Sequence, residues 1–417
     1  MDTLSTPQVS ALLGRADVEL IDVRSVDAYN GWRLQHEARG GHIRGARSLP
    51  CKWTRYIDWP DILREKRIDP QSYLILYGNS DDQVGMVANR LKRAGYSNLA
   101  LYNSFISQWC QDPSKPMQKL SRYRDLIPAR YLYSVLNKIN DGNTILCHVH
   151  YQNPDSYTSG HIPGAIDLDT NKLEDPQTWN RRSPEELKKA LEECGITTDT
   201  TVILYGKFSS PHNNQPFPGS NAGHLGAMRA GVILRYAGVK EVKILNGGLQ
   251  AWIDESYALS TEWVKKKPVT EFRAPIPLHP EYFTNIDKAK GILKDPLCNL
   301  VCVRSRKEYK GEVSGYNYIN KKGRIPGAVF AEGGSDAYHM ENYRNVDHTT
   351  KEYHQIETMW NNVGITPDKH NSFYCGTGWR ASEAFMNAWF MGYHNISVFD
   401  GGWFEWSNDP TNPVITK

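Results

Sequence analysis

The chain contains one pattern three times, and this internal repeat restricts its fold more than any other feature. The segments RIDPQSYLILYG, GITTDTTVILYG and GITPDKHNSFYC match one another and end at Gly78, Gly206 and Cys375. A glycine and a tryptophan follow 17 and 31 residues later in the first and third copies, and 15 extra residues precede them in the second. The motifs GHIRGA, GHIPGA and GRIPGA recur upstream in the same order. These shared landmarks predict three homologous domains.

We place the three domains near residues 1–121, 122–265 and 266–417. The boundaries fall within two segments, QDPSKPMQKLSRYRD and VKKKPVTEFRAP, in which proline and charge replace apolar periodicity. Within each domain, β-rich runs such as LILY, VILY and ISVF alternate with helical patterns such as ASEAFMNAWFMG. This alternation predicts an α/β fold in which each domain has a central, mostly parallel sheet flanked by helices. In such sheets, ligands bind where strand carboxyl ends meet helix amino ends.

Composition and charge exclude several classes of function. The residues are 40% hydrophobic and 23% charged, with a net charge of +3, so no nucleic-acid partner is expected. The longest apolar runs fall far short of the roughly 18 residues that a membrane span needs, so no membrane partner is expected. The seven cysteines include no Cys-x-x-Cys pair, which favours a reducing compartment. We therefore expect a cytoplasmic protein, or a periplasmic one if a leader peptide has been removed.

Cys375 stands between a strand-like run and a helix-like run, and this position predicts a nucleophile. The free N–H groups at a helix start favour negative charge, so a thiol there loses its proton more readily. Gly376 and Gly378 have no Cβ and allow the loop to curl its N–H groups around one sulfur atom. Arg380 adds a positive charge, which predicts contact with an anionic substrate.

The Gly-His-Ile-Pro-Gly-Ala motif, the strand, cysteine loop and helix, and the closing DGGWFEW segment together resemble the rhodanese family of sulfurtransferases. The resemblance covers essentially the whole chain and implies three tandem rhodanese-like α/β domains. It also implies a cysteine that accepts sulfane sulfur as a persulfide and passes it to a thiophilic acceptor, such as cyanide, a thiol or a protein. We expect no metal and no cofactor.

The resemblance assigns residues as well. The persulfide falls on Cys375, and the matching positions give these substrate-binding residues: Gly376, Thr377, Gly378, Trp379, Arg380 and Arg304. Because Gly78 and Gly206 occupy the cysteine position in copies one and two, the first two domains are expected to be inactive.

Three positions depart from the family pattern or have a second interpretation. The aspartate common in the early strand is present as Asp22, and we take Cys147 and Cys302 as its counterparts in the other copies. Glu308 occupies a position that is basic in some thiosulfate-using relatives. Arg304 is interpreted equally well as a residue near the substrate or as part of an ion pair between domains.

Several alternatives concern the donor and the reaction. We expect a small anionic donor, thiosulfate, because it matches the charge of Arg380. The loop also resembles that of the 3-mercaptopyruvate-using branch, which stays the alternative. A phosphatase is less favoured, because its Cys-x5-Arg loop is one residue longer than the Cys-x4-Arg found here. A non-catalytic sulfur-carrier or docking protein leaves Cys375 unexplained. The extra residues after Gly206 are expected to reach the neighbouring domain and to help form the cleft.

Overall fold

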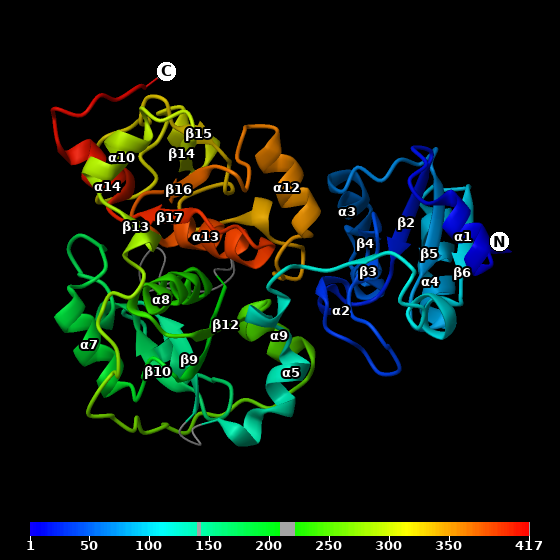
Figure 1. The fold of residues 1–417 in the computed structure, drawn as a ribbon, viewed down its shortest axis with the longest axis horizontal. Helices are drawn as coiled ribbons and strands as arrows, with labels where there is room; N and C mark the ends of the chain where they lie inside the picture. Colours follow the sequence, from blue (N-terminus) through cyan, green and yellow to red (C-terminus); the bar gives the residue numbers. More distant parts are fainter. Residues whose placement is uncertain (140–142, 209–221, 417) are drawn as a thin grey trace. The chain divides into compact units, whose positions relative to one another are not determined.

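The computed structural model describes residues 1–139, 143–208 and 222–416. The chain divides into two compact units, Met1–Arg124 and Asp125–Lys417. Within the described residues, the first unit holds one five-stranded sheet and the second unit holds two. We call the parts built on these sheets domain 1, domain 2 and domain 3, in chain order (Figure 1). Each has the α/β architecture that the sequence predicts.

Domain 1 is built on a fully parallel sheet with the strand order β1-β6-β5-β2-β4. Its strands are β1 (Asp2–Thr3), β2 (Val18–Asp22), β4 (Arg47–Ser48), β5 (Tyr73–Tyr77) and β6 (Leu99–Tyr102), and β3 (His42–Ile43) pairs with β7 (Met117–Gln118) separately. Its helices are α1 (Thr6–Leu12), α2 (Val26–Asn30), α3 (Trp59–Glu65) and α4 (Asp81–Arg93). Leu74 and Leu76 join one buried cluster and Ile75 and Tyr77 another, so both faces of the sheet are covered.

Domain 2 repeats this arrangement with the strand order β10-β9-β11-β12-β8, again fully parallel. Its strands are β8 (Leu126–Ile127), β9 (Thr144–His150), β10 (Ile166–Asp169), β11 (Thr201–Gly206) and β12 (Glu241–Leu245). Its helices are α5 (Ala129–Ser134), α6 (Asp155–Thr158), α7 (Pro184–Glu193), α8 (Gly223–Ala237) and α9 (Gly248–Asp254).

Domain 3 has the strand order β13-β17-β16-β14-β15, and its strands are parallel as well. The strands are β13 (Phe283–Thr284), β14 (Cys298–Cys302), β15 (Val329–Phe330), β16 (His370–Tyr374) and β17 (Ile396–Phe399). The helices are α10 (Ile286–Ile292), α11 (Arg306–Tyr309), α12 (Tyr353–Asn361), α13 (Trp379–Met391) and α14 (Gly402–Asn408).

The strand register aligns the three copies residue by residue. In each copy, one residue of the neighbouring strand pairs with the tyrosine that precedes the cysteine position. The pairs are Asp22 with Tyr77, His148 with Tyr205, and Cys302 with Tyr374. The counterpart of Asp22 in domain 2 is therefore His148, and the assignment of Cys147 from the sequence is wrong by one residue. A shift of one residue moves a strand side chain to the opposite face of the sheet, so this register matters for the alignment.

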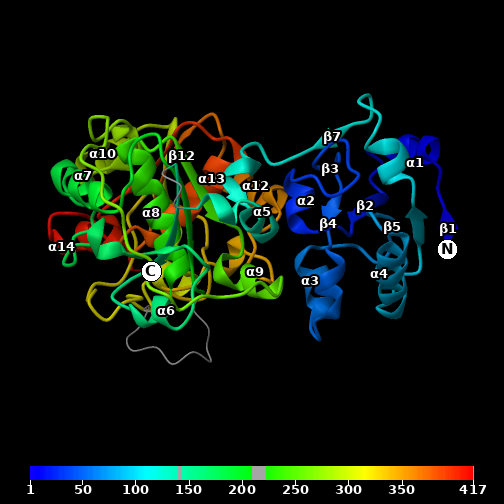
Figure 2. The same cartoon turned by 90° about the horizontal axis from the view of Figure 1, so that it is seen from below.

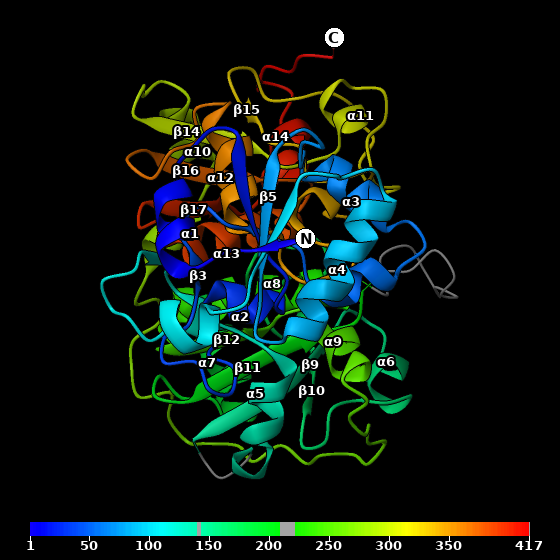
Figure 3. The same cartoon turned by 90° about the vertical axis from the view of Figure 1, so that its right-hand side faces the viewer.

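Helix α8 joins domain 2 to domain 3. All of its residues are buried, because α8 packs on its own sheet and also on α13, as the three views show (Figure 1, Figure 2, Figure 3). The approach is close: a Cβ at Gly226 would lie 3.5 Å from Trp379 Cη2, and a Cβ at Gly231 would lie 3.7 Å from Met386 Sδ, both at van der Waals contact. The two domains therefore share one tightly packed helix interface.

No helix in the described part of the chain is both long enough and apolar enough to cross a membrane.

Candidate active site

Cys375 lies between β16 and α13, at the carboxyl edge of the domain 3 sheet. It is fully buried, and the N–H of Gly378 donates a hydrogen bond to its Sγ over 3.2 Å. Gly378 has a φ of +99°, a left-handed conformation that turns the loop toward the sulfur. The carbonyls of Cys375 and Gly376 accept hydrogen bonds from the N–H groups of Trp403 (2.8 Å) and Phe404 (3.0 Å). The loop is thus held firmly, with its sulfur at the amino end of α13, where negative charge is favoured.

Arg380 closes the loop and forms a buried ion pair with Glu308. Its Nη1 and Nη2 donate to Oε2 and Oε1 of Glu308, each over 2.8 Å, and both side chains are fully buried. Arg380 also donates to the Asp336 carbonyl (2.9 Å) and to the Tyr316 hydroxyl (3.1 Å). Glu308 accepts two further hydrogen bonds, from the N–H and the hydroxyl of Ser305, which cap α11. This arrangement explains the acidic residue at position 308.

The ionisation of both groups follows from their contact. Burial alone would raise the pKa of Glu308, but the charge and hydrogen bonds of Arg380 hold it below its ordinary value. Burial opposes the charge of Arg380, yet Glu308 keeps the pKa of Arg380 well above its ordinary value. The guanidinium is therefore neutralised inside the protein, and its predicted contact with a donor anion stays a prediction.

Arg304 is also buried, and its contacts lie within domain 3. Its Nη2 donates to the carbonyl of Gly323 over 2.7 Å, its Nε lies 3.4 Å from Cys302 Sγ, and its guanidinium lies 4.7 Å from the ring centre of Trp403. Among the described residues, Arg304 forms no ion pair with a carboxylate. The ion pair between domains that the sequence left open for Arg304 is therefore not formed.

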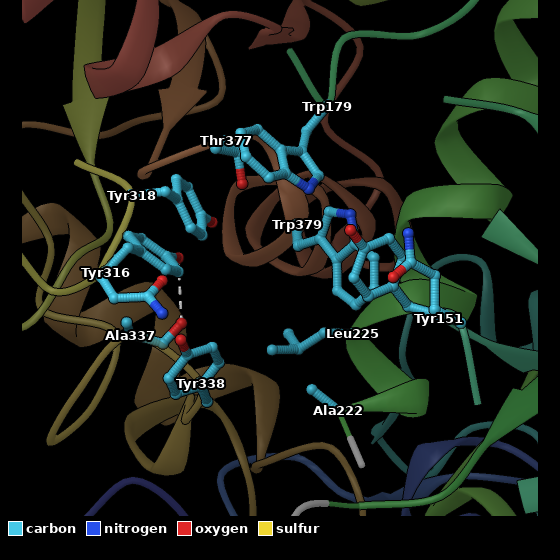
Figure 4. Close-up of a pocket in the computed structure, with 12 residues that line it drawn as sticks. Tyr151, Trp179, Ala222, Leu225, Tyr316, Tyr318, Ala337, Tyr338, Thr377 and Trp379 are labelled. Carbon is cyan, nitrogen blue, oxygen red and sulfur yellow. Dashed lines mark hydrogen bonds between the residues drawn. The ribbon is translucent and has the colours of Figure 1, made fainter. Parts of the chain in front are cut away.

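A pocket of about 190 Å³ lies beside the cysteine loop, between domain 2 and domain 3 (Figure 4). Thr377 and Trp379 of the loop line it directly. Six aromatic side chains dominate its wall: Tyr151, Trp179, Tyr316, Tyr318, Tyr338 and Trp379. The other lining residues are Gln152, Ala222, Leu225, Asn317 and Ala337. We call this space the aromatic pocket.

The aromatic pocket is held in shape by contacts across the domain boundary. Trp179 of domain 2 stacks on Tyr318 of domain 3 with ring centres 4.2 Å apart, and Tyr151 meets Trp379 edge to face at 5.7 Å. Tyr316 packs so closely on the loop that a Cβ at Gly376 would lie 2.1 Å from its ring, which explains that glycine.

The wall of the aromatic pocket is electrically neutral. No Asp, Glu, Lys, Arg or His lines it among the described residues. Burial raises the pKa of Tyr316 and of Tyr318 well above the ordinary value, so both phenols keep their protons at neutral pH. Behind the wall, the indole N–H of Trp379 donates to the carboxylate of Glu174, with Nε1 to Oε2 at 2.9 Å. Of the six rings, Tyr316 already has the Arg380 guanidinium 5.6 Å from its ring centre. The electron-rich faces of the other rings suit a positively charged organic ligand.

Sequence reasoning found the cysteine loop but missed most of the pocket. Of the predicted site residues, Thr377 and Trp379 line the pocket, Cys375, Gly376 and Gly378 form the loop beside it, and Arg380 and Arg304 are buried below. The residues that were missed are Tyr151, Trp179, Tyr316, Tyr318 and Tyr338. They lie in connecting segments outside the shared repeat landmarks, so the repeat comparison gave no signal for them.

The equivalent positions in domains 1 and 2 are closed. A Cβ at Gly206 would lie 2.1 Å from the carbonyl carbon of Gly223, at the start of α8, and a Cβ at Gly78 would lie 2.8 Å from Cγ2 of Val23. No cysteine side chain fits at Gly206 without movement of the backbone. Most of the insertion that follows Gly206 (residues 209–221) lies outside the described residues, so its predicted reach toward domain 3 stays a prediction.

Repeated parallel α/β domains, with a single cysteine at the strand–helix junction of the last one, define a rhodanese-type protein. A rhodanese-like domain model matches residues 5–112, 132–255 and 285–409. The chain therefore belongs to the rhodanese-like family, as its sequence motifs predict. The three matches also confirm three tandem rhodanese-like domains.

Two curated relatives of this chain are proteins of sulfur transfer. The chain is 36% identical to the thiosulfate sulfurtransferase YnjE of Escherichia coli K12, over 99% of this chain and 92% of the relative. It is 31% identical to the sulfur carrier protein TtuD of Thermus thermophilus, over 60% of this chain and 84% of the relative. These relatives support the prediction of a sulfurtransferase that works through a cysteine persulfide.

Solved structures of another relative are more similar. The anaerobic ergothioneine biosynthesis enzyme from Chlorobium limicola, in complex with its natural substrate trimethyl histidine, is 55% identical with a TM-score of 0.97, covering 100% of this chain and 99% of that chain. EanB has the same identity and TM-score, with 99% of each chain covered, in a structure of a variant with a cysteine persulfide in a tetrahedral intermediate state with ergothioneine. These structures leave the predicted substrate, thiosulfate, as only one of the possibilities.

Proposed function

We propose that this protein transfers sulfane sulfur from a persulfide on Cys375 to the imidazole ring of trimethyl histidine and so forms ergothioneine. The observation that carries the proposal is the aromatic pocket beside the cysteine loop. Trimethyl histidine carries a quaternary ammonium group, and aromatic cages are the usual means by which proteins bind such groups. The 55% identity to a structure with trimethyl histidine bound supports the same acceptor.

The charges around the site also favour a cationic acceptor over a second anion. The arginine of the loop is paired with Glu308, so no free cation faces the aromatic pocket from the described residues. A phosphatase would need a guanidinium available to the phosphoryl group, and Arg380 is already bound on both sides of its fork. The geometry therefore supports sulfur transfer to an acceptor with a quaternary ammonium group better than phosphate chemistry.

The reaction can be written with its atoms in balance. The terminal sulfur of the persulfide anion adds to the carbon between the two nitrogens of a protonated imidazole and forms a C–S bond. That carbon then loses its proton to solvent water, the electron pair of the C–H bond forms the C=S bond, and the S–S bond breaks. The Cys375 thiolate leaves, and the N–H of Gly378, 3.2 Å from Sγ, stabilises its charge. The carbon is oxidised and the sulfane sulfur is reduced, so no other oxidant is needed.

One experiment tests the acceptor. The protein is loaded with sulfur from a polysulfide donor, freed of excess donor, and mixed with trimethyl histidine. We expect the peptide that contains Cys375 to lose one sulfur atom and the acceptor to gain one, both measured by mass spectrometry. Histidine, which lacks the quaternary ammonium group, is the matched control and should react much more slowly. A persulfide that cyanide discharges but trimethyl histidine does not would contradict the proposal.

The donor that loads Cys375 is a separate question. Thiosulfate, predicted from the sequence, is supported by the similarity to the thiosulfate sulfurtransferase YnjE, and 3-mercaptopyruvate stays the alternative. A comparison of kcat/KM for thiosulfate, 3-mercaptopyruvate and polysulfide, with one acceptor throughout, ranks these donors. A higher kcat/KM for polysulfide than for thiosulfate would contradict the prediction of thiosulfate, which was made from the charge of Arg380.

A further inference from the structure

Domain 2 has Gly206 at the position equivalent to Cys375, yet its charged side chains reach the cysteine loop of domain 3. The most buried of them is Arg229, in the middle of α8, which is 0% exposed. Its Nε donates to Oε1 of Glu174 over 2.7 Å, and its Nη2 donates both to Oδ1 of Asp400 and, over 3.0 Å, to the carbonyl of Trp179. Arg229 and Glu174 belong to domain 2 and Asp400 belongs to domain 3. We call these three residues the interdomain network.

Asp400 links the interdomain network to the backbone of the loop. It follows β17 directly, and its carboxylate also accepts two hydrogen bonds from domain 2, from the backbone N–H and the guanidinium of Arg181. Three and four residues after Asp400, the backbone N–H groups of Trp403 and Phe404 donate the hydrogen bonds that hold the two loop carbonyls. A shift of Asp400 would therefore be passed to the backbone carbonyls of Cys375 and Gly376.

Glu174 provides a second connection, through the side chain of Trp379. Both carboxylate oxygens of Glu174 lie within hydrogen-bond distance of the Trp379 indole N–H, at 2.9 and 3.1 Å. Trp379 is the first residue of α13 and lines the aromatic pocket. The same carboxylate thus binds Arg229 on one side and the pocket wall on the other.

The third nitrogen of the Arg229 guanidinium, Nη1, lies next to the cysteine loop. Nη1 is buried and has no hydrogen-bond partner among the described residues. It lies so close to Gly378 that a Cβ there would be 3.0 Å from it. Gly378 is the residue whose N–H donates to Cys375 Sγ. The positive charge of Arg229 is therefore held beside Gly378, the residue whose N–H would stabilise an anionic sulfur.

From this arrangement we infer that Arg229 is a positioning residue for sulfur transfer, through which the inactive domain 2 fixes the cysteine loop of domain 3. The inference rests on the proposed sulfur chemistry of Cys375, but it does not depend on the identity of the acceptor. It gives domain 2 a role in the chemical step in addition to the wall that it supplies to the aromatic pocket.

The same two helices contain a matched control. Arg235, also on α8, donates to Oδ2 of Asp125 over 2.9 Å, and Trp389 of α13 donates to the same oxygen over 2.8 Å. This second group of arginine, carboxylate and tryptophan reproduces the chemistry of the interdomain network. It lies six residues further along α8 and ten residues further along α13, so it stabilises the helix pair away from Cys375.

The test compares Arg229→Met, Arg229→Lys and Arg235→Met in the full chain, with thiosulfate as donor and cyanide as acceptor. For Arg229→Met we expect kcat to fall about 10- to 100-fold, the scale of a misplaced reacting group, with the KM for thiosulfate changed by less than about twofold. Arg229→Lys keeps the charge and should recover part of kcat. Arg235→Met should keep kcat within about twofold of the parent, even where the thermal midpoint falls equally.

Two results would overturn the inference: a folded Arg229→Met variant with the parent kcat, or equal losses of kcat in Arg229→Met and Arg235→Met. If Arg229→Met does not fold, Asp400→Asn tests the inference instead. This variant removes the charge that binds Arg229 and keeps the side-chain shape. A folded Asp400→Asn variant with the parent kcat would then overturn it. Because cyanide is the acceptor, inactivity of the parent protein toward trimethyl histidine would refute the proposed function and leave this inference standing.

Discussion

The strand–helix junctions of domains 2 and 3 have the same topology, but they differ in the room for a side chain at the last residue of the junction strand or just after it, Gly206 in domain 2 and Cys375 in domain 3. In both domains a long buried helix follows the inner strand, and a tyrosine precedes the position of the nucleophile. In domain 3, Cys375 and the next three residues curl before α13 begins at Trp379. In domain 2, the backbone of Gly223 fills the space where a side chain at Gly206 would go. The comparison teaches that the fold provides the junction, while the path of the following backbone decides whether a nucleophile fits.

The two junctions also differ in what their helices contribute. Helix α13 presents its amino end to a sulfur, whereas α8 presents its flank and a buried arginine to α13. Domain 2 thus has no room for a side chain at Gly206, and its helix α8 contacts domain 3 through Arg229 and Asp400. Four changes test this difference, beginning with the one of largest expected effect.

Removing the nucleophile gives the largest effect. Cys375→Ser should reduce sulfur transfer by at least about 1,000-fold, because a hydroxyl forms no persulfide and removal of a nucleophile has effects of this size. The measurement is the steady-state rate together with the mass of the loaded protein. Cys298→Ser, at the partly exposed start of β14, is the control and should keep the parent rate. Transfer by Cys375→Ser at the parent rate would place the nucleophile elsewhere.

Breaking the buried ion pair below the loop gives the next largest effect. Arg380→Met leaves Glu308 buried without its partner, which should destabilise domain 3 by about 3–5 kcal/mol. Because Arg380 lowers the pKa of Glu308, the pair stabilises the fold above the ordinary pKa of a glutamate, and this contribution is lost as the pH falls through the lowered value. Denaturant unfolding should therefore show the largest difference between variant and parent at neutral pH. A difference that grows toward acid would contradict this account.

Placing a cysteine in the closed junction should give a smaller effect. Gly206→Cys should destabilise the protein by about 1–3 kcal/mol or more, because its Cβ overlaps the backbone at Gly223. It should carry no second sulfur after treatment with the donor, as mass spectrometry of the intact chain would show. Gly78→Cys, where the nearest atom is a valine methyl, is the milder comparison. A stable persulfide at position 206 would remove the distinction between the two junctions.

The smallest effect concerns the wall of the aromatic pocket. Trp379→Leu removes one ring from the cage and should weaken binding of trimethyl histidine by about 0.5–2 kcal/mol, the usual contribution of a cation–π contact. Trp379→Phe keeps a ring face but loses the N–H bond to Glu174, so it separates the two contributions. Affinities from calorimetry should rank parent, Phe and Leu in that order. Equal affinities of the parent and the Leu variant would show that the ring is not part of the binding site.

The pH dependence of the interdomain network is opposite to that of the ion pair below the loop. Burial raises the pKa of Glu174 to about 7, against the opposing attraction of Arg229. A carboxyl whose pKa is raised on folding costs stability as the pH rises from its ordinary value toward 7. Glu308 contributes the reverse, because its pKa is lowered. The two carboxylates at one loop therefore respond to acid in opposite directions.

Local sequence determined the fold class and the three domains, and it pointed to one candidate nucleophile. Alternating β and helical segments specify parallel α/β layers through backbone periodicity, and a cysteine between glycines at a strand–helix junction specifies its own surroundings within a few residues. Gly78 and Gly206 excluded the same chemistry in the other copies without any knowledge of packing, since glycine has no sulfur. The fold class and the three domains could be read in this way because each depends on neighbours in the chain, while the role of Cys375 stays a prediction.

Only the tertiary structure decided the partners of these residues. The sequence offered Arg380 to a donor, but folding brings Glu308, 72 residues away, to its fork. The hydrogen bonds of Trp379 to Glu174 and of Arg229 to Asp400 span 205 and 171 residues, and the aromatic pocket draws its walls from two domains. The physical reason is that burial removes water from charged and aromatic side chains, and each must then find a partner wherever the packed chain places one.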